Sequence, residues 1–343
     1  MRRLKILATA LLVSASGVRA DVPNVVVDIP PVFSLVSSVM QGVGTPKLLL
    51  RGNESPHNFA LRPSQRRDLG QADIIFWIGE GLTPWLEKAQ ASLTQTPISV
   101  ALGEQTGVVQ LSFREGAFFE NHGDHGDHDD HDGRGEVNGH TEHNRAETHE
   151  NAAAHDGEDN QDHAGHDHAG LDPHFWLDPE NAIHWIYTIA DILSQKDPEN
   201  AGAYYANATR TKASLELLNK NIAQQLAPHR AERFLIVHDA FQYFEARFGL
   251  AAQGAISDGH AAPPSAARIL AIRKLMQDQK ISCVFAEPGY NAKLLDNLIS
   301  ETSVRLKQLD PLGAGLPLDH TLYEAVLQNM ADTMVACFTN NEG

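Results

Sequence analysis

The segment Leu171-Asp-Pro-His-Phe-Trp-Leu-Asp-Pro179 directly follows the most unusual part of the chain, residues 121–170. Those fifty residues hold eleven of the eighteen histidines, in a background of Asp, Glu, Gly, Asn and Ala. The segment 171–179 is instead short and apolar, and its two prolines stiffen the backbone around a single histidine, His174. We interpret the two stretches as a collector of metal ions tethered to the edge of a metal pocket.

The tract 121–170 has the composition of a metal-binding low-complexity segment. It contains too little apolar surface to offset the entropy of ordering it, so we expect disorder without metal. A soluble spacer that binds metal incidentally is the alternative interpretation. The candidate loop ligands are His122, His125, His128, His131, His163, His166 and His168.

The first twenty residues resemble a secretory signal peptide. Three basic residues among the first five precede an apolar run at 6–13, and small residues at positions 18 and 20 form a cleavage site before Asp21. The apolar run is shorter than the roughly 20 residues that a membrane span needs. An uncleaved anchor is the alternative. No cysteine follows the cleavage site, so we expect an unlipidated protein that a second membrane retains in a periplasm.

The formal charge is −17, and removal of the four basic residues of the leader leaves −21. Residues 120–168 contribute −13 of this, so the remaining body carries only about −8. Nucleic acid is an improbable partner for so acidic a chain, whereas cations are natural ones.

Cys283 and Cys337 are the two cysteines. An even count in an exported chain favours one disulfide, and two separate buried thiols are the alternative. A disulfide would leave no thiolate for metal binding.

Strand-like and helix-like patterns alternate along the chain, which predicts parallel sheets covered by helices on both faces. Expected strands lie at 24–29, 46–50, 72–78, 97–100, 234–238, 282–286 and 304–309. Expected helices lie at 30–40, 63–69, 82–92, 178–196, 197–226, 240–247, 265–279, 292–302 and 320–338.

The fold class is therefore α/β, with two lobes joined by one long rigid helix. We expect an N-terminal lobe at 21–197 that includes the tract, a linking helix at 198–227 and a C-terminal lobe at 228–343. The linking helix would be about 45 Å long at 1.5 Å per residue. It is long enough to run along one lobe and reach the other.

Three candidate ligands, His57, His238 and Asp310, stand at or just past the carboxyl end of an expected strand. Ligands of open α/β sheets bind in the crevice outside these ends. With His174 they make three imidazoles and one carboxylate, a set that suits tetrahedral Zn²⁺ in a cleft between the lobes. Each taken alone could instead be a structural residue. We assign His184, His229 and His320 to the surface or to helix ends. His260 is a weak candidate for a second site.

Five ordered motifs together resemble the periplasmic zinc-binding proteins of high-affinity zinc uptake ABC transporters, the ZnuA type within the cluster A-I metal receptors. The motifs are Ser55-Pro-His-Asn-Phe-Ala-Leu-Arg-Pro-Ser64, Asp172-Pro-His-Phe-Trp-Leu-Asp-Pro179, Val237-His-Asp-Ala-Phe-Gln-Tyr-Phe244, Val284-Phe-Ala-Glu-Pro288 and Leu309-Asp-Pro-Leu-Gly313. The resemblance covers essentially the whole mature chain. It implies two lobes bridged by a rigid helix, with zinc between them and delivery to an inner-membrane permease.

The resemblance also implies a ligand set. It carries the family's ligands over to His57, His174 and His238, and less securely to Asp310. Manganese-type relatives have glutamate where His238 stands, and an imidazole in its place favours zinc. Some zinc members have glutamate where Pro56 stands, so the fourth position falls to Asp310 or water, with Glu54 as a distant candidate. The resemblance pairs Cys283 with Cys337.

We therefore expect a monomeric zinc receptor, not an enzyme, with a permease and a periplasmic zinc chaperone as candidate partners. Alternatives are a manganese-type receptor, a metal-dependent adhesin or zinc buffer, and an exported zinc hydrolase. The hydrolase is the weakest, because the chain has no HExxH motif and no clear general base.

Overall fold

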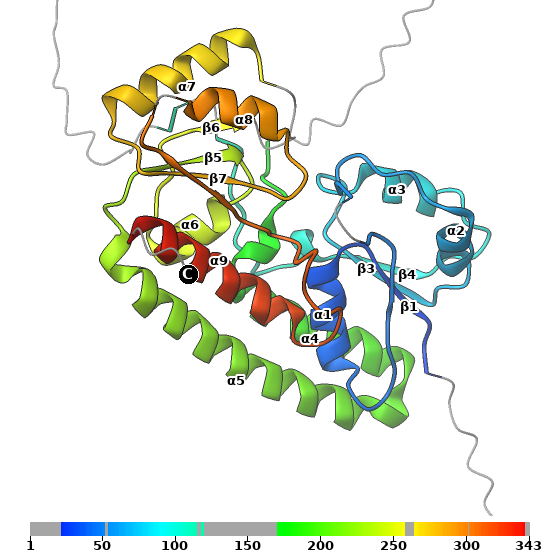
Figure 1. Cartoon of the computed structure of the whole chain (residues 1–343). Helices are drawn as coiled ribbons and strands as arrows, with labels where there is room; N and C mark the ends of the chain where they lie inside the picture. Colours follow the sequence, from blue (N-terminus) through cyan, green and yellow to red (C-terminus); the bar gives the residue numbers. More distant parts are fainter. Residues whose placement is uncertain are drawn as a thin grey trace, which may run out of the picture. The chain divides into compact units, whose positions relative to one another are not determined.

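The computed structural model describes residues 22–51, 54–114, 118–119, 170–257, 264–300 and 302–339 (Figure 1). These residues all belong to one compact unit. The expected signal peptide, the histidines expected to bind metal in the tract, and His260 lie outside the described residues.

The N-terminal half forms a four-stranded parallel sheet in the order β2-β1-β3-β4. Its strands are β1 (Val25–Val27), β2 (Lys47–Leu48), β3 (Ile74–Trp77) and β4 (Ile98–Ala101). Alternate residues face opposite sides. Val25 and Val27 pack into the central core with helix α1 (Pro30–Val39), whereas Val26 packs outward with α2 (Pro63–Gly70) and α3 (Pro84–Gln90). Both faces of the sheet are therefore covered, as predicted.

The C-terminal half repeats this topology as β6-β5-β7-β8, again with all strands parallel. Its strands are β5 (Phe234–His238), β6 (Ala255–Ser257), β7 (Cys283–Ala286) and β8 (Arg305–Gln308). Helix α6 (Gln242–Phe248) packs on the inner face, and α7 (Ala266–Asp278) and α8 (Ala292–Ile299) pack on the outer face. Strand β6 was not predicted, because three residues at a sheet edge are too few to show a period-two pattern.

The predicted long helix is confirmed. After α4 (Pro179–Lys196), a 3-10 turn at Pro198–Asn200 leads into α5 (Ala201–Leu226), whose 26 residues span about 39 Å. One face of α5 is buried against the central core. Its buried apolar residues are Tyr204, Ala208, Leu215, Leu218, Ile222 and Leu226.

A second long helix also connects the two halves. Helix α9 (Leu322–Phe338), the last of the chain, contacts both α1 and α5, so it returns to the first helix of the N-terminal half (Figure 1). One continuous apolar cluster extends from β1 to α9. The disulfide between Cys283 and Cys337 is present and ties β7 to α9, with their Cα atoms 6.3 Å apart. The two sheets therefore share a core and are linked by more than the predicted helix.

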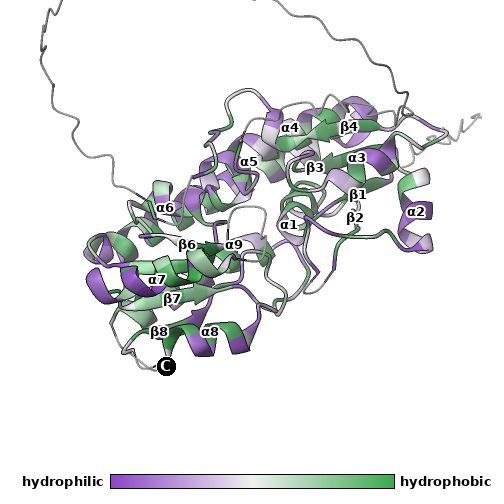
Figure 2. Ribbon diagram, turned by 90° about the horizontal axis from the view of Figure 1, so that it is seen from above, coloured by the Kyte–Doolittle hydropathy of each residue, from purple (hydrophilic) through white to green (hydrophobic). Residues whose placement is uncertain are grey.

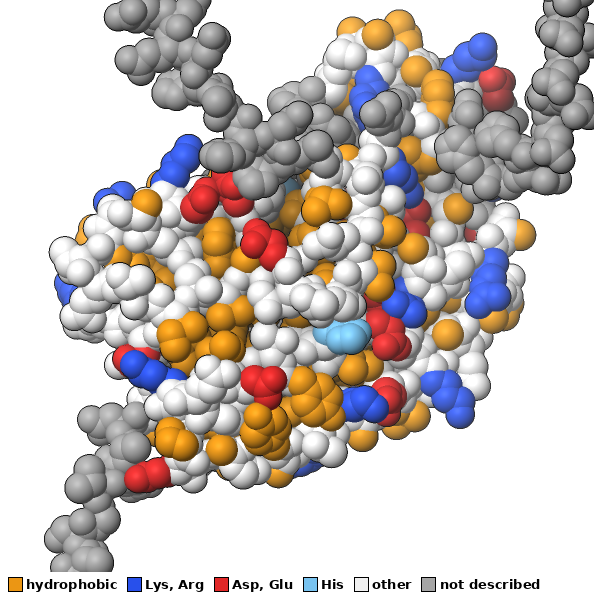
Figure 3. Space-filling view, turned by 180° about the vertical axis from the view of Figure 1, so that it is seen from behind, with side chains coloured by type: hydrophobic (Ala, Val, Ile, Leu, Met, Phe, Trp, Pro, Cys, Tyr) orange, Lys and Arg blue, Asp and Glu red, His pale blue; other side chains and the backbone are white. Residues whose placement is uncertain are grey.

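The distribution of polarity follows this packing. Strands and the inner faces of helices are hydrophobic, whereas the outer faces of helices such as α2, α7 and α8 are hydrophilic (Figure 2). On the face shown in Figure 3, acidic and basic side chains are scattered, and hydrophobic side chains are exposed between them. Within the described ranges, no helix combines the length and the hydropathy that a membrane span requires.

Candidate metal centre

Three histidines from distant parts of the chain meet at one point. His57 lies in the loop between β2 and α2, His174 precedes the 3-10 turn Phe175–Leu177, and His238 ends β5. Their ring centroids are 5.1–5.6 Å apart. Each offers one ring nitrogen that lies within 4.8 Å of the other two. Nitrogens about 2.05 Å from a tetrahedral Zn²⁺ would be about 3.3 Å apart, so small side-chain shifts are enough to hold one ion.

A buried carboxylate orients His174. Asp172 Oδ1 lies 2.6 Å from His174 Nδ1 and also accepts the backbone N–H of His174 at 3.0 Å. Burial raises the pKa of Asp172 to about 7, although the His174 backbone hydrogen bond and the charge of Arg114 oppose this effect. With Nδ1 occupied by Asp172, the Nε2 atom of His174 is the nitrogen available to a metal ion. Carboxylate–histidine pairs of this kind fix the ring and raise its basicity.

A second carboxylate orients His238 in the same way. Glu287 Oε1 lies 3.1 Å from His238 Nδ1. Burial opposes ionisation of Glu287, but the charge of His238 and the hydrogen bond from it outweigh burial and lower the pKa of this carboxyl. Neither Asp172 nor Glu287 was assigned a role from the sequence. Each stands beside a proline in a quoted motif, but their pairing with the rings depends on tertiary structure.

Asp310 occupies a different position from the one expected of a ligand. It lines the same cavity, but its carboxylate accepts backbone N–H groups from Leu312, Gly313 and Ala314 at 2.7–3.0 Å. Among the described residues, the group of mutually close ligand atoms contains only the three histidines. Asp310 therefore holds the turn after β8, and its role as fourth ligand stays a prediction. Glu54 also lines the cavity and pairs with Arg62 at 2.7 Å.

The cavity around the cluster has a volume of about 220 Å³. Trp176, Tyr290 and Pro311 are among the residues that line it beside the histidines. A water molecule takes up about 30 Å³ of liquid, so the cavity has room for an ion that keeps a water ligand. The geometry thus allows three imidazoles and one water around a metal.

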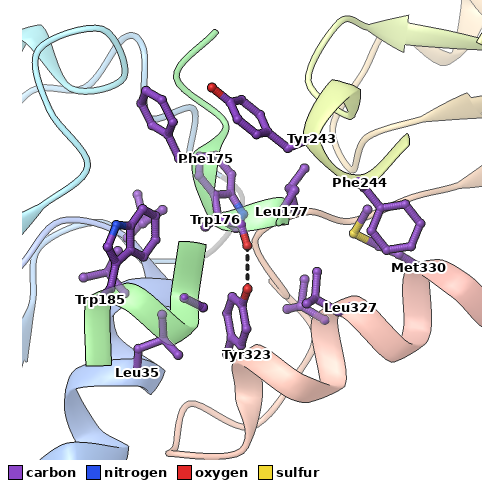
Figure 4. Close-up of a cluster of buried hydrophobic side chains, with 14 of the residues drawn as sticks. Leu35, Phe175, Trp176, Leu177, Trp185, Tyr243, Phe244, Tyr323, Leu327 and Met330 are labelled. Atoms are coloured by element: carbon purple, nitrogen blue, oxygen red, sulfur yellow. Dashed lines mark hydrogen bonds between the residues drawn. The ribbon is translucent and has the colours of Figure 1, made fainter. Parts of the chain in front are cut away.

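The segment that carries His174 is bonded to the C-terminal half. Tyr243 Oη donates to the carbonyl of Asp172 at 2.9 Å, and Trp176 Nε1 donates to the carbonyl of Pro311 at 2.8 Å. Tyr323 Oη from α9 donates to the carbonyl of Trp176 at 2.7 Å (Figure 4). His174 and His238 are therefore both held by elements of the C-terminal half, although His174 belongs to the first half of the sequence.

Two arginines form further ion pairs between the two halves of the chain. Arg247 from α6 binds both carboxylate oxygens of Asp178, which also caps α4, at 2.7 Å each. Arg114 bonds to Asp239, the neighbour of His238, and to Glu245 at 2.8 Å. Burial raises the pKa of Asp239 to about 6, and the charge of Arg114 counteracts this rise. Arg114 thus compensates acidic groups that are packed behind the histidines.

The two segments that flank the tract lie side by side. Ser112 and Leu171 form an antiparallel bridge, and the backbone N–H of Asp172 donates to the carbonyl of Leu111 at 2.8 Å. The segments before and after the tract are therefore paired with each other only a few residues from His174.

The other described histidines lie outside the cluster. His184 is exposed on α4, His229 packs against Phe338, and the carbonyl of His320 accepts the Ser38 hydroxyl. These positions agree with the structural roles expected for them.

The chain is similar to known proteins over almost its whole length. The family model described as zinc-uptake complex component A, periplasmic, matches residues 25–337. The high-affinity zinc uptake system protein ZnuA of Brucella suis is 37% identical over 335 residues, which cover 97% of each chain. The corresponding protein of Yersinia pestis is 29% identical over 331 residues, or 96% of each chain.

Solved structures show the same fold. A zinc-bound deletion mutant of ZnuA matches with a TM-score of 0.68 and 22% identity, covering 92% of this chain and 98% of that one. The periplasmic zinc-binding protein TroA of Treponema pallidum matches with a TM-score of 0.68 and 18% identity, over 92% and 98% of the two chains.

Proposed function

Because the chain belongs to the ZnuA family of periplasmic zinc-uptake components, we propose that it binds Zn²⁺ through His57, His174 and His238 and delivers it to an inner-membrane ABC permease. It is a periplasmic zinc-binding receptor and not an enzyme. The observation that carries the ligand assignment is the convergence of three ring nitrogens within 4.8 Å of one another.

The chemistry of these ligands favours zinc over harder cations. Neutral imidazole suits Zn²⁺, whereas Mg²⁺, Ca²⁺ and Mn²⁺ prefer carboxylate, carbonyl and water oxygens. The two nearby carboxylates, Asp172 and Glu287, contact the far nitrogens of His174 and His238. They strengthen the imidazoles as ligands. Water or Asp310 would complete the tetrahedron, and for Asp310 this would require release of its backbone hydrogen bonds.

The His-rich tract has a proposed supporting role. Histidines tethered in the same chain as a metal site would raise the local zinc concentration, since tethering gives effective concentrations of about millimolar. The pairing of the flanking segments next to Asp172 supports this placement. The tract need not bind tightly and is expected to accept several metals.

Further parts of the proposal concern processing and partners. We expect cleavage between Ala20 and Asp21, a monomeric mature protein, and a zinc chaperone as a second periplasmic partner. We retain the division into lobes at 21–197 and 228–343, with 198–227 as the link. The contacts of α9 with α1 and α5 suggest that relative movement of these lobes is small.

Calorimetry or chelator competition with Zn²⁺ tests the site. His238→Ala should weaken zinc binding at the cleft at least tenfold, because it removes one of three protein ligands. His184→Ala is a matched control, since His184 is an exposed histidine outside the cluster. Deletion of 121–169 keeps Gly170, which accepts a hydrogen bond from Phe113. This deletion should leave cleft affinity nearly unchanged. The reverse pattern would place the principal site in the tract.

A further inference from the structure

The three histidines are held by different parts of the molecule. Tyr243, Tyr323 and Arg247 attach the segment around His174 to the C-terminal half, where His238 also lies. The loop that carries His57 is held instead by helices α2 and α3 of the N-terminal half. The position of His57 relative to the other two ligands therefore depends on how firmly these two helices hold its loop.

Helix α2 closes the base of this loop. Gln65 Nε2 donates to the carbonyl of Leu49 where the loop begins, and Gln65 Oε1 accepts the backbone N–H of Arg62 at 2.7 Å where it ends. Gln65 thus holds the two ends together. The histidine lies between these ends, several residues from either one, so closure of the base does not by itself place the ring.

Trp85 of α3 contacts the loop on both sides of the histidine. Its indole Nε1 donates to the carbonyl of Pro56, the residue before His57, at 2.7 Å. Its ring packs on Phe59, two residues after His57, with centroids 5.0 Å apart and a tilt of 59°. One side chain therefore contacts the loop on either side of a proposed ligand, at the Pro56 carbonyl before it and at the Phe59 ring after it.

The surroundings of Trp85 make this contact important for the loop. Phe59 and Trp85 line a cavity of about 430 Å³ that extends over α2 and α3 and is also bordered by Leu69 and Leu93. A loop beside an open cavity is less constrained by packing than one in a filled core. The hydrogen bond and the ring contact of Trp85 add to the restraint that Gln65 and the Glu54–Arg62 ion pair give the loop.

We propose that Trp85 is a positioning residue for zinc binding, which holds His57 at the distance from His174 and His238 that a shared ion requires. The inference rests on the proposed function, because it takes His57 as a ligand. A loop that samples other positions lowers the apparent affinity by the fraction of time it is correctly placed. Loss of one hydrogen bond should reduce that fraction about three- to tenfold.

The test compares Trp85→Phe with Trp185→Phe in the full mature chain, using Zn²⁺ itself. The first change keeps an aromatic ring against Phe59 and removes the N–H donor. Trp185 is a matched control, since its Nε1 also donates to a carbonyl, that of Leu102 at 2.8 Å, but in the core. Chelator competition measures affinity, stopped-flow chelation measures the zinc dissociation rate, and thermal unfolding reports stability. Phe59→Leu, which removes only the ring contact, is a second variant should Trp85→Phe fold poorly.

Both single changes are repeated in a His57→Ala background. We expect Trp85→Phe to weaken binding about three- to tenfold and to speed dissociation, with no further effect once His57 is absent. Trp185→Phe should lower the unfolding temperature without changing affinity. The inference is overturned if Trp85→Phe changes affinity and dissociation by less than twofold, or weakens binding equally with and without His57. If His57→Ala alone leaves affinity unchanged, the ligand assignment of the proposed function is itself wrong.

Discussion

Replacement of Asp172 by Asn separates the two effects of this carboxylate, on the metal ligand and on the fold. Asn keeps an oxygen that can accept the backbone N–H of His174, now at 3.0 Å from Asp172 Oδ1. Asp172 Oδ2 lies 3.1 Å from the side-chain amide of Gln242, with that amide oriented to donate. The Gln242 amide can rotate to accept from an Asn at 172. The shape of the site is therefore preserved, while the negative charge 2.6 Å from His174 Nδ1 is lost.

The expected loss of zinc affinity is 10- to 100-fold, roughly 1.4–2.7 kcal/mol, as is typical when a carboxylate behind a metal-bound histidine is removed. The metal-free protein should respond differently. Burial raises the pKa of Asp172 to about 7, so the folded state disfavours the charged carboxylate above that pH. The variant without metal should therefore be at least as stable as the parent at pH 8. Chelator competition at pH 7.5 gives the affinity, and thermal unfolding in excess chelator gives the stability.

Asp310→Asn is the control from the same cavity. The Asp310 carboxylate accepts three backbone N–H groups of the turn that follows β8. If water is the fourth ligand, replacement of Asp310 should lower the free energy of unfolding and leave the zinc affinity nearly unchanged. A twofold or smaller loss of affinity for Asp172→Asn would refute the reasoning that Asp172 orients and strengthens His174. A large loss for Asp310→Asn would identify Asp310 as a ligand.

Two further predictions concern the fold. Asp28, fully buried in the N-terminal half, has its pKa raised to about 7 by burial, although hydrogen bonds from Ile78 and Ile29 oppose this. The folded state then binds this proton more tightly than the unfolded state does. The metal-free protein should therefore lose stability as pH rises from about 4 through 7. Thermal unfolding in excess chelator across that pH range measures the loss. An unfolding temperature that rises steadily from pH 5 to pH 8 would contradict this expectation. Replacement of Cys283 and Cys337 by Ser should lower the free energy of unfolding by roughly 4 kcal/mol, from the entropy of a closed loop with a separation of 54 residues. Zinc affinity should change little, since Cys283 pairs with Phe234 at the opposite end of β5 from His238. A matching loss of affinity would show that the disulfide positions the site.

The elements of the fold were largely readable from local patterns. The run Phe234–His238 was predicted at its observed bounds, because both faces of a central parallel strand are buried and the strand is apolar throughout. Asp178 and Pro179 predicted the start of α4, and Asp178 does accept the backbone N–H of Glu180 at 2.9 Å. Strand β6 was missed for the opposite reason, since Ala255–Ser257 pairs along one edge of the sheet and its three residues carry no pattern.

Within the candidate site, the sequence by itself determined which imidazoles could meet. His57 follows β2 and His238 ends β5, so each lies toward the carboxyl end of a strand in its own parallel sheet, where ligands of open α/β sheets bind. Only the tertiary structure decided which side chains contact these imidazoles and their loops. The contacts of Asp172 with His174, Glu287 with His238, and Trp85 with the His57 loop join groups whose pairing depends on packing between elements.

The turn role of Asp310 and the return of α9 to α1 belong to the same class. Periodicity reports which face of an element is buried, because burial repeats with the geometry of a helix or strand. It does not report which element covers that face, because the sequence pattern of one apolar surface looks like that of many others that could pack against it. That choice is made only when the whole core is packed.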